Sequence, residues 1–510
     1  MIWRRSLRTP VLTAAALLFL LVCVLPVASI VWGAVTQGIG QSNVFETVLL
    51  DARQRSLLTN SALLAGGTAI LATVIGAPLG VALSRVPLGQ KPALRVALAA
   101  PVTLPPYIVA LAWIYLGGSW IYSLPGAVIV LSLVFYPLSM LATEAAMRHV
   151  DGRLEEAALL IAPPGRVLRR ITAPLVAPAV LAAGLVIFVL ALSEFGVPGL
   201  LRVRVYPTEV FTAFAALYDV GRATLLMLPL LLLSTTIAVM AGVIGGDRFV
   251  VARRVTGAAP LLLPAFRRPV IASVVGVIFV ALVLPVAVLA REASGTRLLS
   301  TVIASGEAIV NSLVLSTVGA SAVIGLAIWV GYARARARPS VGRAVDVLLV
   351  VLFAVPGTVV GVGLIGFWNR PGPLGALYGT DAMTLLAYLA RLVPVAVLTI
   401  AAAIRSVPVS HEEAGAVSGA GWLRTLRHLV LPQTTIALAA AWVVAFILAF
   451  GELGAAILVA PPGEATLPIR IYTMIANAPP SQVAALALLQ ASIVGAPLAL
   501  LGLAASRSRR

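Results

Sequence analysis

Apolar segments long enough to cross a lipid bilayer recur along the whole chain, separated by short polar stretches. A spanning helix needs about 20 mainly apolar residues, because every backbone polar group in lipid must find its partner within the segment. Twelve segments meet this requirement: 11–33, 57–84, 96–118, 125–147, 174–200, 224–245, 270–290, 309–332, 344–368, 382–404, 434–460 and 483–505. The pattern predicts an all-α polytopic membrane protein of about twelve transmembrane helices.

The composition agrees with this pattern. Hydrophobic residues make up 61% of the 510 positions and charged residues only 11%, whereas soluble domains are near half apolar and about a quarter charged. The net charge of +18 raises the alternative of nucleic-acid binding, since phosphates attract basic surfaces. The basic residues are dispersed over many loops without interleaved aromatic residues, so we expect contact with membrane lipid and no nucleic acid.

Most of the lysines and arginines lie in every second loop, starting with Arg4, Arg5 and Arg8 and ending with Arg507, Arg509 and Arg510. Loops with an excess of lysine and arginine lie on the cytoplasmic side of the membrane. We therefore predict a multi-pass membrane protein with both termini in the cytoplasm. The segment 11–33 exceeds the apolar core of a cleaved signal peptide, which favours a retained first helix. The single cysteine, Cys23, excludes a disulfide framework.

Polar landmarks recur at a nearly constant separation in the two halves of the chain. Asn60-Ser61 corresponds to Asn311-Ser312, Pro105 to Pro356, Glu155-Glu156-Ala157 to Glu412-Glu413-Ala414, Pro174 to Pro432, and Ser193-Glu194-Phe195-Gly196 to Gly451-Glu452-Leu453-Gly454. Shared apolar composition would not produce such matches. The spacing predicts a tandem duplication of two six-helix halves in the same orientation, residues 1–255 and 256–510.

One duplicated loop, EEAGAVSGAGWLRTLRHLVLP at 412–432, is polar, basic and rich in glycine. Its two glutamates are expected near the start of a short helix, where carboxylates complement the helix dipole. Gly415, Gly419 and Gly421 permit a sharp bend or a close backbone approach, and Pro432 is expected in the first turn of the next span. A single such loop reads as an ordinary solvated segment, but two equivalent copies favour a docking element.

This loop resembles the Glu-Ala-Ala loop of permease subunits in binding-protein-dependent ABC importers. The second half carries Glu413, Ala414, Gly415 in place of the second alanine, Gly419, Leu429, Leu431 and Pro432. The first half carries Glu156, Ala157 and Ala158, lacks the glycine, and has Gly165 late and one residue fewer before Ile171, Ala173 and Pro174. As a chain with two fused halves, it most resembles the permeases of ferric-iron importers, and next those of thiamine importers.

The resemblance implies a type I ABC importer permease fold and a division of labour among subunits. A separate ATPase homodimer would bind the two loops, and an extracytoplasmic substrate-binding protein would deliver the solute. The coupling residues it implies are Glu155, Glu156, Ala157, Ala158, Gly165, Glu412, Glu413, Ala414, Gly415 and Gly419. The chain has no G-x-x-x-x-G-K-[ST] phosphate loop, so we expect no bound cofactor here, no catalytic residue, and ATP on the partner.

Charged residues inside spans usually face an interior cavity, because their insertion into lipid is unfavourable. Glu194, Glu452 and Arg391 are the candidates for the translocation pathway. For the glutamates, a polar gate and a structural contact between helices are equal alternatives, while Arg391 fits a structural or snorkelling role better. Pro105, Pro106 and Pro356 are expected to kink helices.

Two other functions are alternatives, a secondary transporter and a membrane enzyme. A secondary transporter would also have twelve spans and a repeat, but it would not need a duplicated docking loop. A membrane enzyme would need a cluster of catalytic groups, and His149, His411 and His428 all lie near predicted inner loops. No metal site is expected from these residues.

Overall fold

The computed structural model describes residues 8–39, 52–88, 91–216, 220–245, 266–295 and 298–507, and this part of the chain consists of helices joined by short turns, with no strand. Eight helices are long and apolar enough to cross a membrane, or up to ten when two bent pairs are each counted as one span. The all-α fold class is confirmed, while the count of twelve stays a prediction. The predicted border at 255/256, the arginines before it at 248, 253 and 254, and Arg4, Arg5, Arg509 and Arg510 lie outside the described residues.

Two compact units divide the chain. Unit 1 comprises residues 1–48, 210–231 and 305–470, and unit 2 comprises residues 49–209, 232–304 and 471–510. Each unit therefore combines helices from both predicted halves. The division of the sequence into 1–255 and 256–510 concerns the repeat and stays a prediction.

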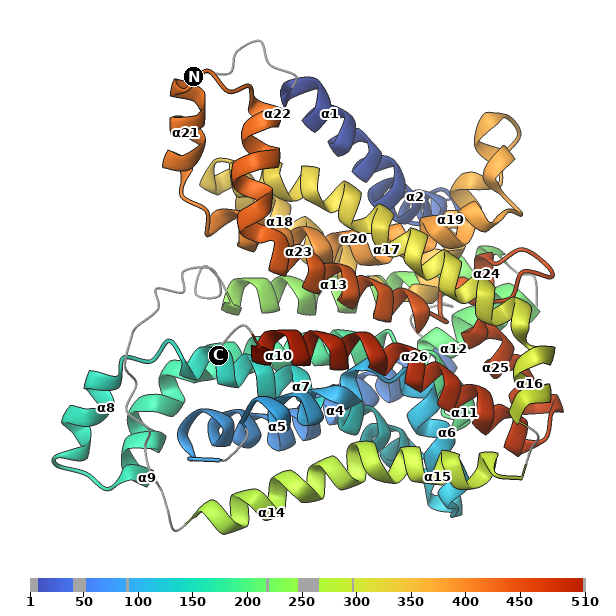
Figure 1. Cartoon of the computed structure of the whole chain (residues 1–510). Helices are drawn as coiled ribbons and strands as arrows, with labels where there is room; N and C mark the ends of the chain where they lie inside the picture. The colour runs from blue at the N-terminus through green and yellow to red at the C-terminus, as the bar shows by residue number, and fades with distance from the viewer. Residues whose placement is uncertain are drawn as a thin grey trace. The chain divides into compact units, whose positions relative to one another are not determined.

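Unit 2 is centred on two long helices, α4 (Ala52–Arg85) and α7 (Leu124–Met147), which pack along one another (Figure 1). Other helices of this unit are α5 (Lys91–Ala99), α6 (Pro106–Leu116), α8 (Gly152–Leu159), α9 (Pro164–Val167), α10 (Ala173–Leu192), α11 (Gly196–Leu200), α14 (Arg267–Ile278), α15 (Leu284–Ala293), α16 (Leu298–Ala304) and α26 (Pro480–Arg507). In Figure 1, the short helices α8 and α9 lie at one end of the unit.

Unit 1 repeats this arrangement around α17 (Gly306–Ala335) and α20 (Asp381–Arg405). Its other helices are α1 (Arg8–Phe19), α2 (Leu25–Ile39), the first part of α13 (Val220–Gly245), α18 (Pro339–Ala354), α19 (Gly357–Trp368), α21 (Val409–Val417), α22 (Trp422–Thr425), α23 (Leu431–Phe450) and α24 (Ala456–Val459). The chain passes from one unit to the other within α12 (Tyr206–Phe211), within α13 and within α25 (Leu467–Asn477). The α21 and α22 pair lies at one end of unit 1 (Figure 1).

The first helix of each predicted half packs on helices of the opposite half. The π-helical turn Leu20–Val24 joins α1 to α2, and this run contacts α17, α19 and α20 within unit 1. The turn Phe279–Val283 joins α14 to α15, and that run contacts α5 and α6 of the first half, and also α26 of its own half, within unit 2. Apolar side chains on all these helices are interchangeable in character, so the choice of packing partner leaves no signal in the sequence.

Two predicted spans are broken rather than straight. The third is interrupted between the run Lys91–Thr103 and α6 by a bend of 89°, and the ninth between α18 and α19 by a bend of 98°. Leu104 and Val355 have extended backbones just before Pro105 and Pro356, as expected of a residue that precedes proline. The predicted kinks are confirmed, and they are sharper than a bend within a continuous helix.

The fifth and eleventh predicted spans begin earlier than expected. Continuous helical runs extend from Pro164 to Leu192 and from Trp422 to Phe450, so Pro174 and Pro432 do not open these helices. A wider π-helical turn, Leu168–Thr172 in one run and Leu426–Val430 in the other, directly precedes each proline region. Such a turn shifts the backbone bonding pattern, and the helix continues past a residue that has no N–H.

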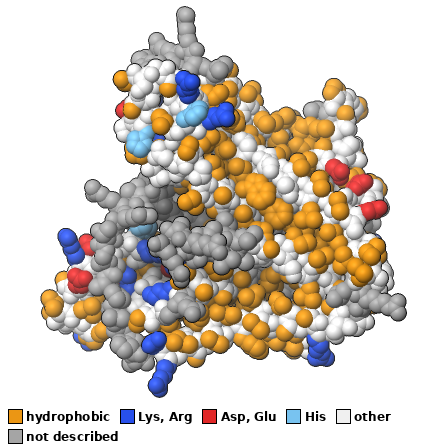
Figure 2. Space-filling view, viewed as in Figure 1, with side chains coloured by type: hydrophobic (Ala, Val, Ile, Leu, Met, Phe, Trp, Pro, Cys, Tyr) orange, Lys and Arg blue, Asp and Glu red, His pale blue; other side chains and the backbone are white. Residues whose placement is uncertain are grey.

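Large apolar side chains are exposed along the long helices, as in Ile70 and Val74 on α4 and Ile436 on α23. Figure 2 shows hydrophobic side chains over most of the face in view. Water would disfavour so much exposed apolar surface, whereas lipid does not. The chain is a multi-pass membrane protein.

Candidate functional site

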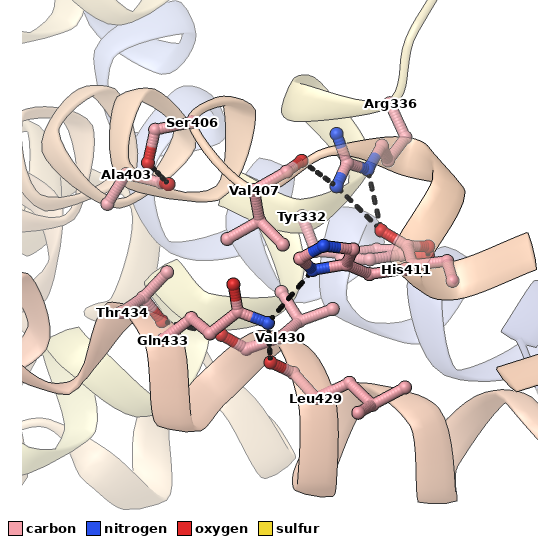
Figure 3. A network of polar contacts seen from close by, with 11 residues as sticks. Tyr332, Arg336, Ala403, Ser406, Val407, His411, Leu429, Val430, Gln433 and Thr434 are labelled. Atoms are coloured by element: carbon pink, nitrogen blue, oxygen red, sulfur yellow. Dashed lines mark hydrogen bonds and ion pairs between the residues drawn. The ribbon is translucent and has the colours of Figure 1, made fainter. Parts of the chain in front are cut away.

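The second polar loop begins with α21, whose first turn carries Glu412. The Arg336 Nε donates to Glu412 Oε1 over 2.8 Å, and the Tyr332 hydroxyl donates to Glu412 Oε2 over 2.7 Å (Figure 3). Only 12% of the Glu412 side chain and 11% of the Arg336 side chain are exposed. The carboxylate of Glu412 therefore faces the end of α17 and not the solvent.

Further contacts hold α21 on both sides (Figure 3). Arg336 Nη2 also donates to the backbone oxygen of Val407 over 3.0 Å, just beyond the end of α20. The Gln433 amide lies 3.2 Å from His411 Nδ1 and donates to the Leu429 carbonyl over 2.8 Å. The short helix is thus tied to α17, to the end of α20 and to the start of α23.

Aromatic rings pack behind the Glu412 contact. The ring of buried Trp422 lies 5.6 Å from that of Tyr332 and 6.1 Å from that of Trp329. On the other side, the guanidinium carbon of Arg8 lies 5.6 Å from the centre of the Tyr332 ring, within the range of a cation–π attraction. The amino-terminal helix therefore contacts the same tyrosine that binds the loop.

The glycines of the second loop have different structural roles. Gly419 has φ +77°, and the bonds from its N–H to Ala416 and from the Ala420 N–H to Gly415 close a Schellman motif that ends α21. A Cβ on Gly415 would lie 2.9 Å from Thr425 Oγ1, so glycine replaces the second alanine of the motif where α21 approaches the following helix. Gly421 has an ordinary extended backbone.

The first loop begins with α8 and is built on the same plan. Glu155 is 1% exposed, accepts a hydrogen bond from Thr172 Oγ1 at 2.7 Å, and pairs with Arg85 Nη2 at 3.1 Å. Arg85 Nη2 also donates to the Met147 carbonyl over 3.1 Å. Both loops therefore use their first glutamate to bind an arginine at the end of a long helix.

The turn after α8 differs from the turn after α21. Ala162 stands where the second loop has its left-handed glycine, and the chain redirects at Pro163 and Pro164, with Pro164 opening α9. Gly165 is exposed, and a Cβ there would meet nothing within 4 Å. The missing glycine of the first motif is thus matched by a different turn in the chain.

The second glutamates, Glu156 and Glu413, are exposed, and so are Ala157 and Ala414, while Ala158 is partly buried. At the end of each short helix a large apolar residue is also exposed, namely Leu160 at 87% and Val417 at 85%. In Figure 2, basic and histidine side chains gather over the α21 and α22 end of unit 1. Each loop thus presents a carboxylate and an apolar side chain outward.

Sequence reasoning counted Arg85 and Arg336 only as cytoplasmic charges and missed their part in the site. The signal was present, because the two arginines are separated by the same number of residues as Asn60 and Asn311. Those landmarks are also placed alike, since Ser61 Oγ accepts from the Tyr206 N–H at 2.9 Å and Ser312 Oγ from the Leu467 N–H at 2.6 Å.

The candidate pathway residues take part in local contacts. Glu194 Oε1 accepts from the Gly196 N–H at 3.0 Å and Glu452 Oε1 accepts from the Ala455 N–H at 2.9 Å, so each caps the short helix that follows. Arg391 Nε lies 3.0 Å from Glu452 Oε2, whereas Val134 occupies the equivalent position in the first half. Within the described ranges, no group of three or more His, Cys, Asp and Glu residues could hold a metal ion.

Comparisons with known proteins agree with this arrangement. Residues 323–506 match the family of binding-protein-dependent transport system inner membrane components. The chain is 25% identical over 471 residues to the Fe(3+)-transport system permease protein FbpB 2 of Haemophilus influenzae, covering 89% of this chain and 91% of that protein. It is 32% identical over 163 residues to the ABC transporter permease protein ORF1 of Streptomyces antibioticus, covering 32% of this chain and 69% of that protein.

Proposed function

This chain belongs to the family of inner membrane components of binding-protein-dependent transport systems, and from that premise we propose that it conducts ferric iron through an ATP-driven importer. It is an ABC importer permease. Ferric iron is favoured because FbpB 2 of Haemophilus influenzae, which matches this chain over 91% of its own length, is named as an Fe(3+)-transport permease. Thiamine or another small solute carried by the same machinery is the second candidate.

The coupling loops carry the proposal that a separate ATPase homodimer drives transport. Glu156 and Glu413 are exposed at equivalent places on two short helices, each beside an exposed apolar side chain, Leu160 or Val417. A carboxylate next to an apolar residue suits a protein interface that combines an apolar centre with a polar rim. The two sites match the two copies of a homodimeric ATPase.

The remaining partners follow from this division of labour. An extracytoplasmic binding protein supplies the substrate, membrane lipid surrounds the apolar helices, and ATP and its hydrolysis belong to the partner subunit, so this chain is not an enzyme and needs no cofactor. The chain lies in the bacterial inner membrane with both termini in the cytoplasm, which the basic loops support. A secondary transporter is the alternative that lacks an ATPase.

The decisive experiment compares wild-type protein with Glu156→Arg plus Glu413→Arg. We expect the wild type to co-purify with its ATPase and to take up labelled ferric iron, delivered by its binding protein, into vesicles that contain ATP. The charge-reversed variant should lose both properties. Glu292→Arg on α15, near a predicted outer loop, is the control and should keep both. Uptake that follows an ion gradient without any ATPase would instead establish a secondary transporter, and uptake of thiamine but not iron would correct the substrate.

A further inference from the structure

The two halves place an arginine at the same point of the fold. Arg85 is the last residue of α4, and Arg336 directly follows α17. Each forms an ion pair with the first glutamate of its polar loop and donates to a backbone carbonyl near the start of that loop, as described above. Such an arrangement fastens a short helix to a long membrane helix and to the end of that helix's neighbour.

The burial of these pairs separates them from the exposed face of the loops. The side chains of Arg85 and Glu155 are 6% and 1% exposed, so a docked protein would not reach them without displacing α8. Glu156 and Glu413 are the exposed residues of the same helices. Removing one member of a largely buried ion pair leaves the other charge uncompensated, so each pair resists separation.

The helix α4 is closely packed on α7 in the turns before Arg85. A Cβ on Gly76 would lie 2.3 Å from the Tyr136 carbonyl oxygen, and one on Gly80 would lie 2.5 Å from the Met140 carbonyl oxygen. Backbones that approach so closely leave little freedom for α4 to slide along α7. A displacement of α8 that pulls on Arg85 would therefore move α4 and α7 together.

We propose that Arg85 and Arg336 are positioning residues that transmit movements of the coupling helices α8 and α21 to the membrane helices α4 and α17, without contacting the ATPase themselves. This inference rests on the proposed function, because it assumes that an ATPase docks on α8 and α21. The two glutamates of each pair then have different roles. Glu155 and Glu412 bind within the permease, and Glu156 and Glu413 face the ATPase.

The two connections are not identical. Besides its arginine, Glu155 accepts a hydrogen bond from Thr172 in the π-helical turn before α10, whereas Glu412 accepts one from Tyr332 of α17. Arg8 also contacts the Tyr332 ring. The connection in unit 1 therefore joins α1, α17 and α21 through one tyrosine, and its loss should affect transport more than loss of the Arg85 connection.

The test uses four variants of the full chain, reconstituted into liposomes with the ATPase and the binding protein. They are Arg85→Ala plus Arg336→Ala, the conservative Arg85→Lys plus Arg336→Lys, the docking variant Glu156→Arg plus Glu413→Arg, and Arg343→Ala as an exposed arginine control on α18. For each one, membrane insertion, ATPase co-purification, ATP hydrolysis and solute uptake are measured. Lysine keeps the charge but offers fewer donors, so it should restore part of the coupling.

We expect the double alanine variant to insert, to retain the ATPase within about twofold of wild type and to hydrolyse ATP, while uptake per ATP falls by about tenfold or more, the size of a typical coupling term. The docking variant should instead lose the ATPase.

Equal loss of the ATPase in both variants would make the arginines part of the docking surface, and unchanged uptake in the double alanine variant would make them ordinary structural residues. Absence of an ATPase from the wild type would overturn the proposed function itself. If the alanine variant fails to insert, the double lysine variant must show a partial loss of uptake per ATP while it retains the ATPase, or the inference is wrong.

Discussion

Arg391 and Glu452 form an ion pair that joins α20 to the turn after α23, with Arg391 Nε 3.0 Å from Glu452 Oε2. The two side chains are 20% and 11% exposed. The other oxygen of Glu452 accepts a hydrogen bond from the Ala455 N–H at 2.9 Å. The pair therefore fixes a turn between helices of unit 1. Whether the same residues also contact a passing solute stays a prediction.

Breaking this pair from one side should destabilise the protein more than replacing both members. Arg391→Met leaves the Glu452 charge uncompensated, and we expect it to lower the free energy of unfolding by about 3 kcal/mol. The double variant Arg391→Met plus Glu452→Gln removes both charges and keeps an acceptor for the Ala455 N–H, so its loss should be smaller. Thermal unfolding of the purified protein in detergent measures both. A double variant that is less stable than Arg391→Met alone would contradict the coupling.

Gly357, the first residue of α19, makes room for the same pair. A Cβ there would lie 2.5 Å from Arg391 Nη1 and 3.0 Å from Glu452 Oε1. Gly357→Ala should therefore displace the guanidinium and lower the unfolding free energy by about 1–3 kcal/mol. Gly366→Ala on the same helix meets nothing within 4 Å and should be neutral or slightly stabilising.

The crowding at Gly357 can also be tested by combining Gly357→Ala with a change at Arg391. In the Arg391→Met background the Cβ faces a flexible apolar side chain, so Gly357→Ala should be less harmful there than in the wild type. Equal losses in both backgrounds, measured by the same unfolding assay, would show that the alanine acts through some other neighbour.

The end of α21 depends on the left-handed backbone of Gly419, at φ +77°. Gly419→Ala should strain the Schellman motif by about 1–2 kcal/mol, loosen the carboxyl end of the coupling helix and reduce ATP-driven uptake. Asparagine tolerates this backbone region better, so Gly419→Asn should stay close to wild type. Gly421→Ala, at a position with an ordinary extended backbone, serves as the control. The idea fails if alanine and asparagine at position 419 reduce uptake equally.

Local patterns in the sequence predicted several parts of the structure. The apolar periodicity indicated an all-α membrane protein, the prolines at 105 and 356 indicated the breaks in two spans, and the Glu-Glu pairs indicated short helices with carboxylates in the first turn. Each of these features is set by residues close together in the chain. Propensity and capping therefore suffice to predict them.

Contacts between distant segments were not predictable in the same way. Arg85 lies far from Glu155 in the sequence, and Arg391 lies far from Glu452, yet each pair meets in the fold. The packing of α1 and α2 on the helices of the second half also depends on surfaces that are apolar throughout. Only a comparison of equivalent positions in the two halves could have indicated the arginines, because a single sequence gives no other sign of distant contacts.

The two halves provide a matched test of helix packing at Gly80 and Gly331, which occupy equivalent positions on α4 and α17. A Cβ on Gly80 would lie 2.5 Å from the Met140 carbonyl oxygen and 2.7 Å from Thr143 Cβ, whereas one on Gly331 would first meet Ile400 Cγ2 at 3.2 Å. A Cβ on Gly331 would also lie 3.3 Å from the Ala401 backbone N, but its contacts are all longer than those at Gly80, where the backbone oxygen cannot move aside without separating α4 from α7. Small residues at such crossings let the helices approach.

Gly80→Ala should therefore lower the unfolding free energy by about 1–3 kcal/mol and reduce the amount of folded protein recovered from membranes, whereas Gly331→Ala should have a smaller effect. Gly276→Ala on α14, where a Cβ would meet nothing within 4 Å, is the control for a general effect of alanine in a spanning helix. Recovery after mild detergent extraction and the midpoint of thermal unfolding provide the two measurements. An equal loss at Gly80 and Gly331 would mean that the closer backbone approach of α4 and α7 does not govern stability, and the rigid α4–α7 connection inferred for coupling would lose its support.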